Sequence, residues 1–539
     1  MLLRRLFAAA LVGAAACFVR AAEVTVIAHE PGYYTSLAKH ARRWFGEMGI
    51  ASTLATPAGM AGELKTAKLA LLVGFERPTA AEMKTLGAFR ARGGKLVVFY
   101  SSSPELAKLM GVRLLKHRTA AYPGQWSRMS FSAPVPEGMP SVILQTSSVL
   151  NAAIPEPGLG RILAVWGDRA GKSTGDAAWI ETGAGWWMTH VLLADGDEHL
   201  KAQLLAAIAS RVDPKLWNYR AFAARAAAEK QRLAAYAKAQ VPRKGEIHAV
   251  WDHSGAGLYP GDWPRTMHEL SEARVTDLFV NVAGAGFAHY PSDVLPRSKL
   301  FEQEGDQLAA CLKAAKGTGI RVHAWILCFT GTRSTPERLE VFRKKGWRLA
   351  GADGKPSEYL DPSNRELQQY LLGAIHELAS KYPVSGVHLD FVRWYEGTNK
   401  AKSVQAVSNF VLEARRHVKR PKWLTAAVFG KYPECVRKVG QDWTGWLEGN
   451  FVDYVVPMDY TEDMSLFTEL LSRHAQKKSL ARRVIVGIGV TANESRLGAK
   501  AVIDQILLTR RYGMAGVSLF DLDVTLEKRI FPYLKLGLW

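Results

Sequence analysis

The sequence predicts an α/β protein in which a (β/α)8 TIM barrel follows a smaller α/β domain with a parallel sheet. From Glu246 to the end of the chain, eight short apolar strand segments alternate with helical segments. The roughly 290 residues of this part are in the range of one barrel. The composition, with 48% hydrophobic and 22% charged residues, is that of an ordinary globular protein.

The first 21 residues predict a secretory signal peptide. Arg4 and Arg5 provide a basic start, an apolar run follows to Val19, and Val19-x-Ala21 suits cleavage. The apolar core is too short to span a membrane stably. We therefore expect a secreted or periplasmic protein. The segment ending at Cys17 also resembles a lipoprotein cleavage site, but it lacks the aliphatic residue expected three positions earlier, so a lipid anchor is the less favoured alternative.

Residues 22–214 predict the smaller domain, because strand and helix patterns alternate along them. The expected strands are Glu23–Ala28, Lys68–Val73, Lys95–Tyr100, Ser141–Gln145, Gly160–Trp166, Ala178–Glu181 and Gly185–Leu193, and the helices are Tyr33–Met48, Thr79–Arg92 and His199–Ser210. The arrangement resembles flavodoxin-like domains of the class I glutamine amidotransferase type. Those enzymes carry a nucleophilic cysteine on a strand-to-helix turn, where this chain has Ser101-Ser102-Ser103. We therefore expect a non-catalytic docking or interaction domain.

Residues 215–245 predict a helical linker. Leu216–Gln240 is rich in Ala, Lys, Arg and Glu and contains neither Gly nor Pro, so it favours a helix. The stretch Val241–Gly245, with its proline and glycine, ends that helix.

The second domain, residues 246–539, predicts the barrel itself. Its expected strands are Ile247–Trp251, Asp277–Val282, Arg321–Leu327, Val384–Leu389, Leu424–Phe429, Val452–Met458, Val484–Ile488 and Gly516–Phe520. Segments such as Gln303–Lys316 and Arg365–Lys381 carry apolar residues at helical spacing, as an outer ring of helices requires. The longest interval separates the third strand from the fourth, so we expect a loop there to cover the mouth.

The fourth strand ends in the most informative side chain, Asp390. Val387 and Leu389 are expected to face one side of this strand, and His388 and Asp390 the other. A carboxylate that faces inward at the end of an apolar strand is costly to bury. In a parallel barrel that end is also where active sites lie. The alternative is that Asp390 caps a turn or pairs with Arg393.

The other strand ends bring more acids and aromatic rings to the same rim. Rings offer flat apolar surfaces to sugars, and carboxylates bind hydroxyls or transfer protons. Each residue alone is typical of packing, but recurrence on six of eight strands predicts a carbohydrate site. The substrate-binding candidates are Trp251, Asp252, Asn281, His323, Trp325, His388, Arg393, Trp394, Glu434, Tyr460 and Asp521. The two histidines and Asn281 have core hydrogen bonding as their alternative.

Five segments together resemble the glycosyl-hydrolase-like 10 family over roughly residues 246–525. They are Tyr359–Leu367, Gly386–Arg393, His323–Trp325, Val455–Tyr460 and Gly516–Phe520. The resemblance implies an exported TIM-barrel glycoside hydrolase acting on a polysaccharide, with peptidoglycan glycan strands as one substrate associated with the family. Trp394-Tyr395 departs from the usual aromatic–proline pair, which concerns the shape of the sugar subsite.

Similarity to retaining barrel hydrolases implies Asp390 as the nucleophile and Asp459 as the general acid/base. Asp252 and Glu434 are the rival acids. No metal or cofactor is expected, since Cys311, Cys328 and Cys435 are sparse and the histidines are not clustered. The alternative function is a non-catalytic carbohydrate-binding or envelope scaffolding protein on a degenerate barrel, which would keep the tryptophans without needing two acids.

The net charge of +20 bears on the partners. No nucleic-acid-binding motif is present, and nucleic acid is not expected to be a partner of an exported protein. The basic residues are spread along helical segments, which indicates a generally cationic, solvated surface. Attraction to anionic polymers of a cell envelope is the functional alternative.

Overall fold

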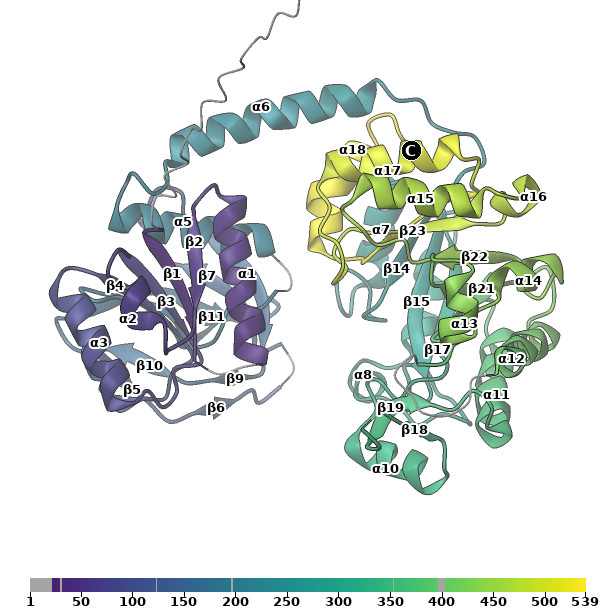
Figure 1. Cartoon of the computed structure of the whole chain (residues 1–539), viewed down its shortest axis with the longest axis horizontal. Coiled ribbons are helices and arrows are strands. Elements are labelled where there is room, and N and C mark those ends of the chain that lie inside the picture. The colour runs from purple at the N-terminus through teal and green to yellow at the C-terminus, as the bar shows by residue number, and fades with distance from the viewer. Residues whose placement is uncertain (1–21, 30–31, 123, 195–196, 352, 396–402) are drawn as a thin grey trace, which may run out of the picture. The chain divides into compact units, whose positions relative to one another are not determined.

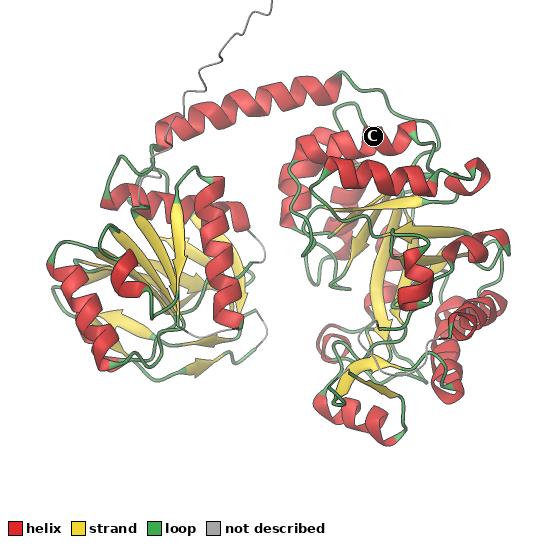
Figure 2. Ribbon diagram, in the orientation of Figure 1, coloured by secondary structure: helices red, strands yellow, loops and turns green. Residues whose placement is uncertain are grey.

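A computed structural model describes residues 22–29, 32–122, 124–194, 197–351, 353–395 and 403–539 of the chain. The chain divides into one unit that ends at Ala226 and a second unit, Ala227–Trp539. Figures 1 and 2 show the elements of each unit. The expected signal peptide and Cys17 lie outside the described residues.

The first unit is built on a mixed sheet. Its order is β2-β1-β3-β4-β13-β12-β11-β7-β8, parallel from β2 to β13 and antiparallel beyond. The predicted parallel sheet thus forms one half. The other half is antiparallel because two residues join β12 to β13, too few for a parallel crossover. The strands are β1 (Val24–Ala28), β2 (Ser52–Ala55), β3 (Leu69–Val73), β4 (Lys95–Phe99), β7 (Trp126–Phe131), β8 (Val142–Ser147), β11 (Gly160–Gly167), β12 (Ser173–Thr182) and β13 (Gly185–Met188).

Helices cover both faces of this sheet. Alternate strand residues enter two separate cores, so that Val26 packs with α1 (Tyr33–Glu47) and α5 (Glu198–Val212), whereas Ile27 packs with α3 (Ala80–Ala91) and α4 (Pro104–Met110). Short elements complete the unit: α2 (Met60–Glu63), β5 (Val112–Leu114), β6 (Arg118–Thr119), β9 (Val149–Leu150) and β10 (Ala153–Pro155).

The helix α6 (Tyr219–Lys238) contains the division between the two units. It lies within the segment that the sequence assigns to the linker. Its C-terminal end belongs to the second unit, where Ala237 is buried and the Tyr236 hydroxyl donates to Asp504 over 2.7 Å.

The second unit contains the predicted barrel. Its strands follow the order β22-β21-β20-β17-β15-β14-β24-β23, every pair is parallel, and bridges Val455–Val484 and Met458–Gly487 bring β22 to β23. The eight-stranded parallel barrel is therefore confirmed and is nearly closed. The strands are β14 (Ile247–Asp252), β15 (Asp277–Gly284), β17 (Arg321–Leu327), β20 (Gly386–Asp390), β21 (Trp423–Val428), β22 (Tyr454–Pro457), β23 (Ile485–Gly489) and β24 (Gly516–Phe520), with β16 (Phe287–Ala288) paired to β15.

An outer layer of helices surrounds these strands (Figure 2). Val250 and Leu278 pack outward against the helices, whereas Trp251 and Phe279 fill the interior, as the alternation of strand side chains requires. The helices are α7 (Trp263–Glu272), α8 (Lys299–Glu304), α9 (Gln307–Ala315), α11 (Arg365–Lys381), α12 (Val404–His417), α13 (Glu434–Val439), α14 (Trp443–Glu448), α15 (Met464–His474), α16 (Lys478–Ala481), α17 (Ala499–Arg511) and α18 (Phe531–Leu534). Among the described helices, none is long and apolar enough to cross a membrane.

The long interval between β17 and α11 forms a small excursion at the carboxyl end of β17 (Figure 1). It contains α10 (Pro336–Lys344) and the hairpin of β18 (Arg348–Ala350) and β19 (Pro356–Leu360). A bridge between Thr330 and Tyr359 ties the hairpin back to the barrel. This excursion supplies side chains to the mouth, as described next.

Candidate active site

Asp390 stands at the carboxyl end of β20 with one carboxylate oxygen engaged and the other open. Its Oδ1 accepts hydrogen bonds from the Phe391 N–H at 2.6 Å and from Arg393 Nη1 at 3.3 Å. Within the described chain, Oδ2 accepts no hydrogen bond. The residue is 6% exposed. The turn contact and the Arg393 pair that the sequence offered as alternatives are thus both present, and an oxygen is still left for a substrate.

Arg393 is held between two aromatic rings. Its guanidinium carbon lies 4.0 Å from the centroid of Phe391 and 4.8 Å from that of Phe429. Phe391 adopts φ 51°, in the left-handed region that a bulky residue rarely enters. Local backbone strain of this kind is common where a reactive side chain must be held in one direction. Sequence reasoning did not identify either phenylalanine.

A second arginine reaches the mouth from the excursion after β17. Arg333 Nη1 donates to Asn281 Oδ1 at 2.6 Å and to the His253 carbonyl at 3.0 Å. Its Nη2 lies 3.4 Å from His289 Nε2. Arg333 and His289 were missing from the sequence-based candidates. Arg333 was missed because the excursion has no strand pattern that would place it above the barrel.

These contacts shift the titration of both histidines. Burial, followed by the Arg333 charge, lowers the pKa of His289 to about 3. Its Nδ1 lies 2.6 Å from the Ser298 hydroxyl, which fits a neutral ring that donates there and accepts from Arg333. Desolvation and Arg333 also lower the pKa of the exposed His253, and the Asp390 charge opposes them.

Asp521, at the end of β24, provides a carboxyl of the opposite character to Asp390. Burial, and next the charge of Asp252, raise the pKa of Asp521 well above its usual range. Its Oδ1 accepts from the N–H of His253 at 3.1 Å and of Leu522 at 2.7 Å. A carboxyl with a raised pKa retains its proton at higher pH, which is what a general acid requires.

The pKa of Tyr460 is affected by the charges of both acids, Asp390 and Asp521. After desolvation, the charges of Asp390 and then Asp521 make the largest contributions that raise the pKa of its phenol well above the usual value. The ring stacks on Phe520 with a 5.4 Å centroid distance. Tyr460 therefore stays a neutral hydrogen-bond donor at the mouth.

Asp252 is engaged by the loop that follows β14. Its carboxylate accepts from the backbone N–H groups of Ser254, Gly255 and Gly257 at 2.9–3.2 Å and from the Ser254 hydroxyl at 2.6 Å. The side chain is completely buried, and desolvation raises its pKa. Asp252 therefore holds this loop in place, and its charge contributes to the raised pKa of Asp521.

Asp459 has surroundings that differ from those expected of the acid/base. On β22 and beyond, Val456, Met458 and Tyr460 belong to the barrel interior, whereas Asp459 faces α15, where Oδ2 pairs with His474 Nε2 at 2.8 Å. Both side chains are fully buried. Its Oδ1 has no hydrogen-bond partner in the described chain and lies against Gly430. The predicted pairing of Asp459 with Asp390 is not what this geometry favours.

Two of the expected sugar platforms are packed inside the protein. Trp251 is 1% exposed, and its indole N–H donates to His388 Nε2 at 3.0 Å. Trp394 is also 1% exposed and belongs to the outer core, where it donates to the Ser403 carbonyl. Their burial argues against direct stacking on a sugar. Trp325 is also buried, with 3% exposed, but its ring lies 5.8 Å from that of His253 at the mouth.

The remaining candidates lie deeper or farther out. His388 Nδ1 lies 2.8 Å from the Thr425 hydroxyl, and His323 Nε2 lies 2.8 Å from buried Asp277, so both histidines are hydrogen-bonded core residues, the alternative weighed from the sequence. Glu434 begins α13 and pairs with Arg473 of α15 at 2.9 Å. The structure thus brings Asp390, Arg393, Asn281, Tyr460 and Asp521 to the mouth and gives the other acids structural partners.

In the first unit, Tyr100 and the serines Ser101–Ser103 form the strand-to-helix turn after β4. Tyr100 adopts φ 48° at this turn. The Ser101 hydroxyl donates to the Phe75 carbonyl at 2.5 Å, and Ser103 caps α4 by accepting from the Leu106 N–H. Ser101 and Ser103 are therefore engaged in holding the turn.

Comparisons with known proteins find glycosyl-hydrolase-like sequences for part of the second unit. The glycosyl hydrolase-like 10 model matches residues 262–406, which supports the family resemblance in that stretch. Glycosyl hydrolase DigH of Escherichia coli (strain K12) is 28% identical over 144 residues, 23% of this chain, and the match spans 32% of that relative's length. The amidotransferase-like resemblance of the first unit stays a prediction.

The solved structures that resemble part of this chain include two glycosidases. The glycoside hydrolase domain of PgaB (BpsB) from Bordetella bronchiseptica is 12% identical, with a TM-score of 0.44, and the match covers 54% of this chain and 99% of that domain. Alpha-L-fucosidase isoenzyme 2 from Paenibacillus thiaminolyticus is 14% identical, with a TM-score of 0.40, and covers 55% of this chain and 48% of its own.

Proposed function

We propose that this protein is an exported glycoside hydrolase that cleaves glycosidic bonds of a polysaccharide at the carboxyl-terminal mouth of its barrel. The observation that carries the proposal is the state of Asp390. One oxygen is fixed by the Phe391 N–H and Arg393, and the other is open at the end of a barrel strand. The family match over residues 262–406 supports the same class of reaction.

In the proposed reaction Asp390 acts as the nucleophile. Its open oxygen attacks the anomeric carbon, the bond from that carbon to the leaving oxygen breaks, and a glycosyl ester forms. Arg393 and the Phe391 N–H hold Oδ1 in place, so that the other oxygen is directed toward the substrate. Water then attacks the anomeric carbon and releases Asp390.

We assign the proton transfers to Asp521 in place of Asp459. The raised pKa of Asp521 keeps a proton available for the leaving oxygen, and the resulting carboxylate accepts a proton from the attacking water. Asp459 is fully buried against His474 and faces the helical layer. Tyr460 and the Arg333–Asn281 pair lie where they would donate hydrogen bonds to sugar hydroxyls.

The substrate proposed is an envelope or environmental polysaccharide, with peptidoglycan glycan strands as the first candidate. The expected signal peptide would bring the enzyme to such polymers. The +20 charge would favour association with an anionic envelope. The first unit is proposed as a non-catalytic docking domain, and a fragment of residues 23–212 is expected to fold without hydrolysing glutamine.

The test is incubation of the purified protein with a panel of defined glycans, including peptidoglycan stripped of its peptides, followed by mass spectrometry of the products. New reducing ends on one substrate, absent with Asp390→Asn, are expected. Tight binding measured by calorimetry, without product from any glycan in a broad panel, would instead indicate the non-catalytic carbohydrate-binding function and end the hydrolase proposal.

A further inference from the structure

A basic cavity lies at the end of the barrel opposite Asp390. Its volume is about 380 Å³. Several of its lining residues are the first residues of barrel strands, as Ile247 is of β14 and Tyr454 is of β22, so the cavity occupies the amino-terminal end of the barrel. The lining consists of Arg243, Gly245, Ile247, Arg321, Trp423, Tyr454, Arg482 and Ala515.

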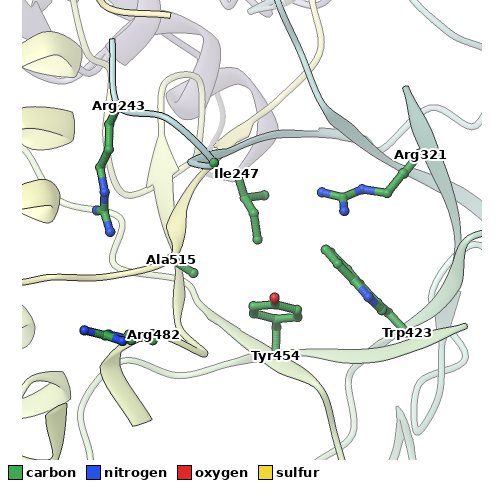
Figure 3. A pocket seen from close by; sticks show the side chains of 8 residues that line it. Arg243, Ile247, Arg321, Trp423, Tyr454, Arg482 and Ala515 are labelled. Carbon is green, nitrogen blue, oxygen red and sulfur yellow. The ribbon is translucent and has the colours of Figure 1, made fainter. Parts of the chain in front are cut away.

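Three arginines border this space from two sides. Figure 3 shows Arg243 and Arg482 on one side and Arg321 with Trp423 on the other, with the Tyr454 ring between them. The Arg321 guanidinium lies 4.2 Å from the Trp423 ring centroid. The tryptophan therefore holds one cation in place at the edge of the cavity.

The arginines keep donors available. Arg321 uses Nε and Nη2 in bonds of 2.9 and 2.7 Å to Asp277, which leaves Nη1. Arg243 uses Nη1 for the Met514 carbonyl at 2.8 Å. The Arg482 side chain is exposed and has neither a hydrogen bond nor an ion pair with any residue in the described ranges.

The charges around the cavity do not balance. Of the three guanidinium groups, that of Arg321 is paired with an acid, Asp277. Asp277 is also hydrogen-bonded to His323. The nearby Asp453 is already paired with Arg415 at 2.6 Å and Arg420 at 3.1 Å. An excess of two positive charges is therefore left beside the cavity.

Tyr454 adds a neutral donor to this cationic lining. Burial raises the pKa of its phenol, so the hydroxyl keeps its proton. Its ring lies 4.6 Å from that of Trp423. Guanidinium groups and a phenol hydroxyl are hydrogen-bond donors of the kind that bind a tetrahedral oxyanion.

We propose that this cavity binds the phosphoryl group of a phosphate monoester, at a site separate from the hydrolytic mouth. A monoester carries close to two negative charges at neutral pH, which matches the two uncompensated arginines, whereas a carboxylate carries one. The volume is in the range of small-ligand pockets. A soluble sugar phosphate and a phosphomonoester lipid headgroup share this chemistry.

The test uses the full chain and two probes. Calorimetry with glucose 1-phosphate measures the soluble ligand, and sedimentation with vesicles containing phosphatidic acid measures the headgroup. The variants are Arg482→Gln, which removes a guanidinium without breaking any internal bond of the described chain, and Tyr454→Phe. The matched control is Arg416→Gln on α12, where the exposed guanidinium pairs with Glu413 and with no other residue of the described ranges.

We expect wild type to bind at least one probe, with weaker affinity at higher salt. Arg482→Gln should weaken that binding by about tenfold, Tyr454→Phe by a smaller factor, and Arg416→Gln should leave it unchanged. If Arg482→Gln weakens glucose 1-phosphate binding, the ligand is a soluble ester. If it weakens vesicle binding alone, the ligand is a lipid headgroup. Binding of neither probe, equal binding by all variants, or glucuronate binding as tightly as glucose 1-phosphate would overturn the proposal. Since no cleavage is measured, this outcome is independent of the hydrolase proposal.

Discussion

Arg393 holds the carboxylate of Asp390 from one side only, with a 3.3 Å contact to Oδ1 and a guanidinium fixed between Phe391 and Phe429. The pair therefore combines two properties that a nucleophilic carboxylate needs. Its charge is stabilised by a cation that cannot easily turn away, and Oδ2 stays accessible to a reacting carbon. The first two predictions follow from this arrangement and from the different surroundings of Asp521.

Replacement of Asp390 by Asn should remove cleavage while leaving the fold intact. The amide oxygen can still accept from the Phe391 N–H, but it cannot attack an anomeric carbon, so we expect turnover to fall roughly 10³-fold or more. Product formation and thermal unfolding would be measured on the same preparations. Glu434→Gln is the matched control, because Glu434 pairs with Arg473 on the helical layer and should not affect the rate. Near-normal turnover by Asp390→Asn would remove this residue from the mechanism.

Replacement of Asp521 by Asn should affect substrates according to their leaving groups. If Asp521 supplies the proton, Asp521→Asn should slow cleavage of a natural glycoside strongly and of a nitrophenyl glycoside much less, because nitrophenolate leaves without protonation. The wild-type rate should fall as pH rises through the raised pKa of Asp521, and the variant should lose that alkaline limb. Asp459→Asn is the comparison. A leaving-group dependence in Asp459→Asn and none in Asp521→Asn would return the role to Asp459.

Trp251 is predicted to contribute to the stability of the fold and not to sugar binding. It is 1% exposed, and its N–H bonds His388 inside the barrel, so Trp251→Ala should cost about 3–5 kcal/mol of unfolding free energy. Trp251→Phe should cost less, since most of the ring volume is retained. Urea unfolding measures both, and calorimetry with an oligosaccharide shows whether the folded Phe variant still binds. A stable Trp251→Phe protein that has lost sugar binding would show that the indole contacts substrate.

His289 is predicted to make the protein less stable as the pH falls from about 6.5 toward 3. The folded protein keeps this histidine neutral with a pKa of about 3, whereas an unfolded histidine protonates near pH 6.5. Over that window the unfolded state binds the extra proton. Stability is therefore complete above pH 6.5 and declines by up to about 1.4 kcal/mol per pH unit below it.

The variant His289→Gln tests this dependence. Glutamine can still donate toward Ser298 and accept from Arg333, and it does not titrate. Urea unfolding at pH 6.5 and pH 5 should show a difference in wild type that exceeds that of the variant by up to about 2 kcal/mol. His268→Gln, an exposed site on α7, should behave like wild type. Equal pH dependence in His289→Gln and wild type would contradict the assignment.

The barrel was predictable because its signal is repeated in the sequence. Eight apolar segments gave strands whose observed ends differ from the predicted ones by two residues at most, as when β20 begins at Gly386 and not at Val384. In the antiparallel half of the first sheet, three strands were predicted but not their antiparallel direction, and β7 (Trp126–Phe131) was missed because it lacks an apolar run. The short loop between β12 and β13 was the available clue.

The site was predictable only where strand position decides it. Asp390, Asn281, Tyr460 and Asp521 follow from their places at strand ends. The direction of a side chain one residue past a strand does not, so Asp459 was expected at the mouth and is found against His474. Arg333 could not be predicted, because tertiary folding of the excursion brings it to Asn281.

The residues at the mouth come from two separate parts of the unit, the barrel strands and the excursion that carries Arg333. A barrel strand carries the proposed nucleophile, whereas the cation that contacts Asn281 and His289 comes from the excursion between β17 and α11, outside the barrel strands. Exchange of that excursion for another would change the charge offered to a glycan and leave Asp390 and its supports in place. If the proposed function holds, a chimera made by swapping this one segment is expected to take on the donor's sugar preference while keeping Asp390.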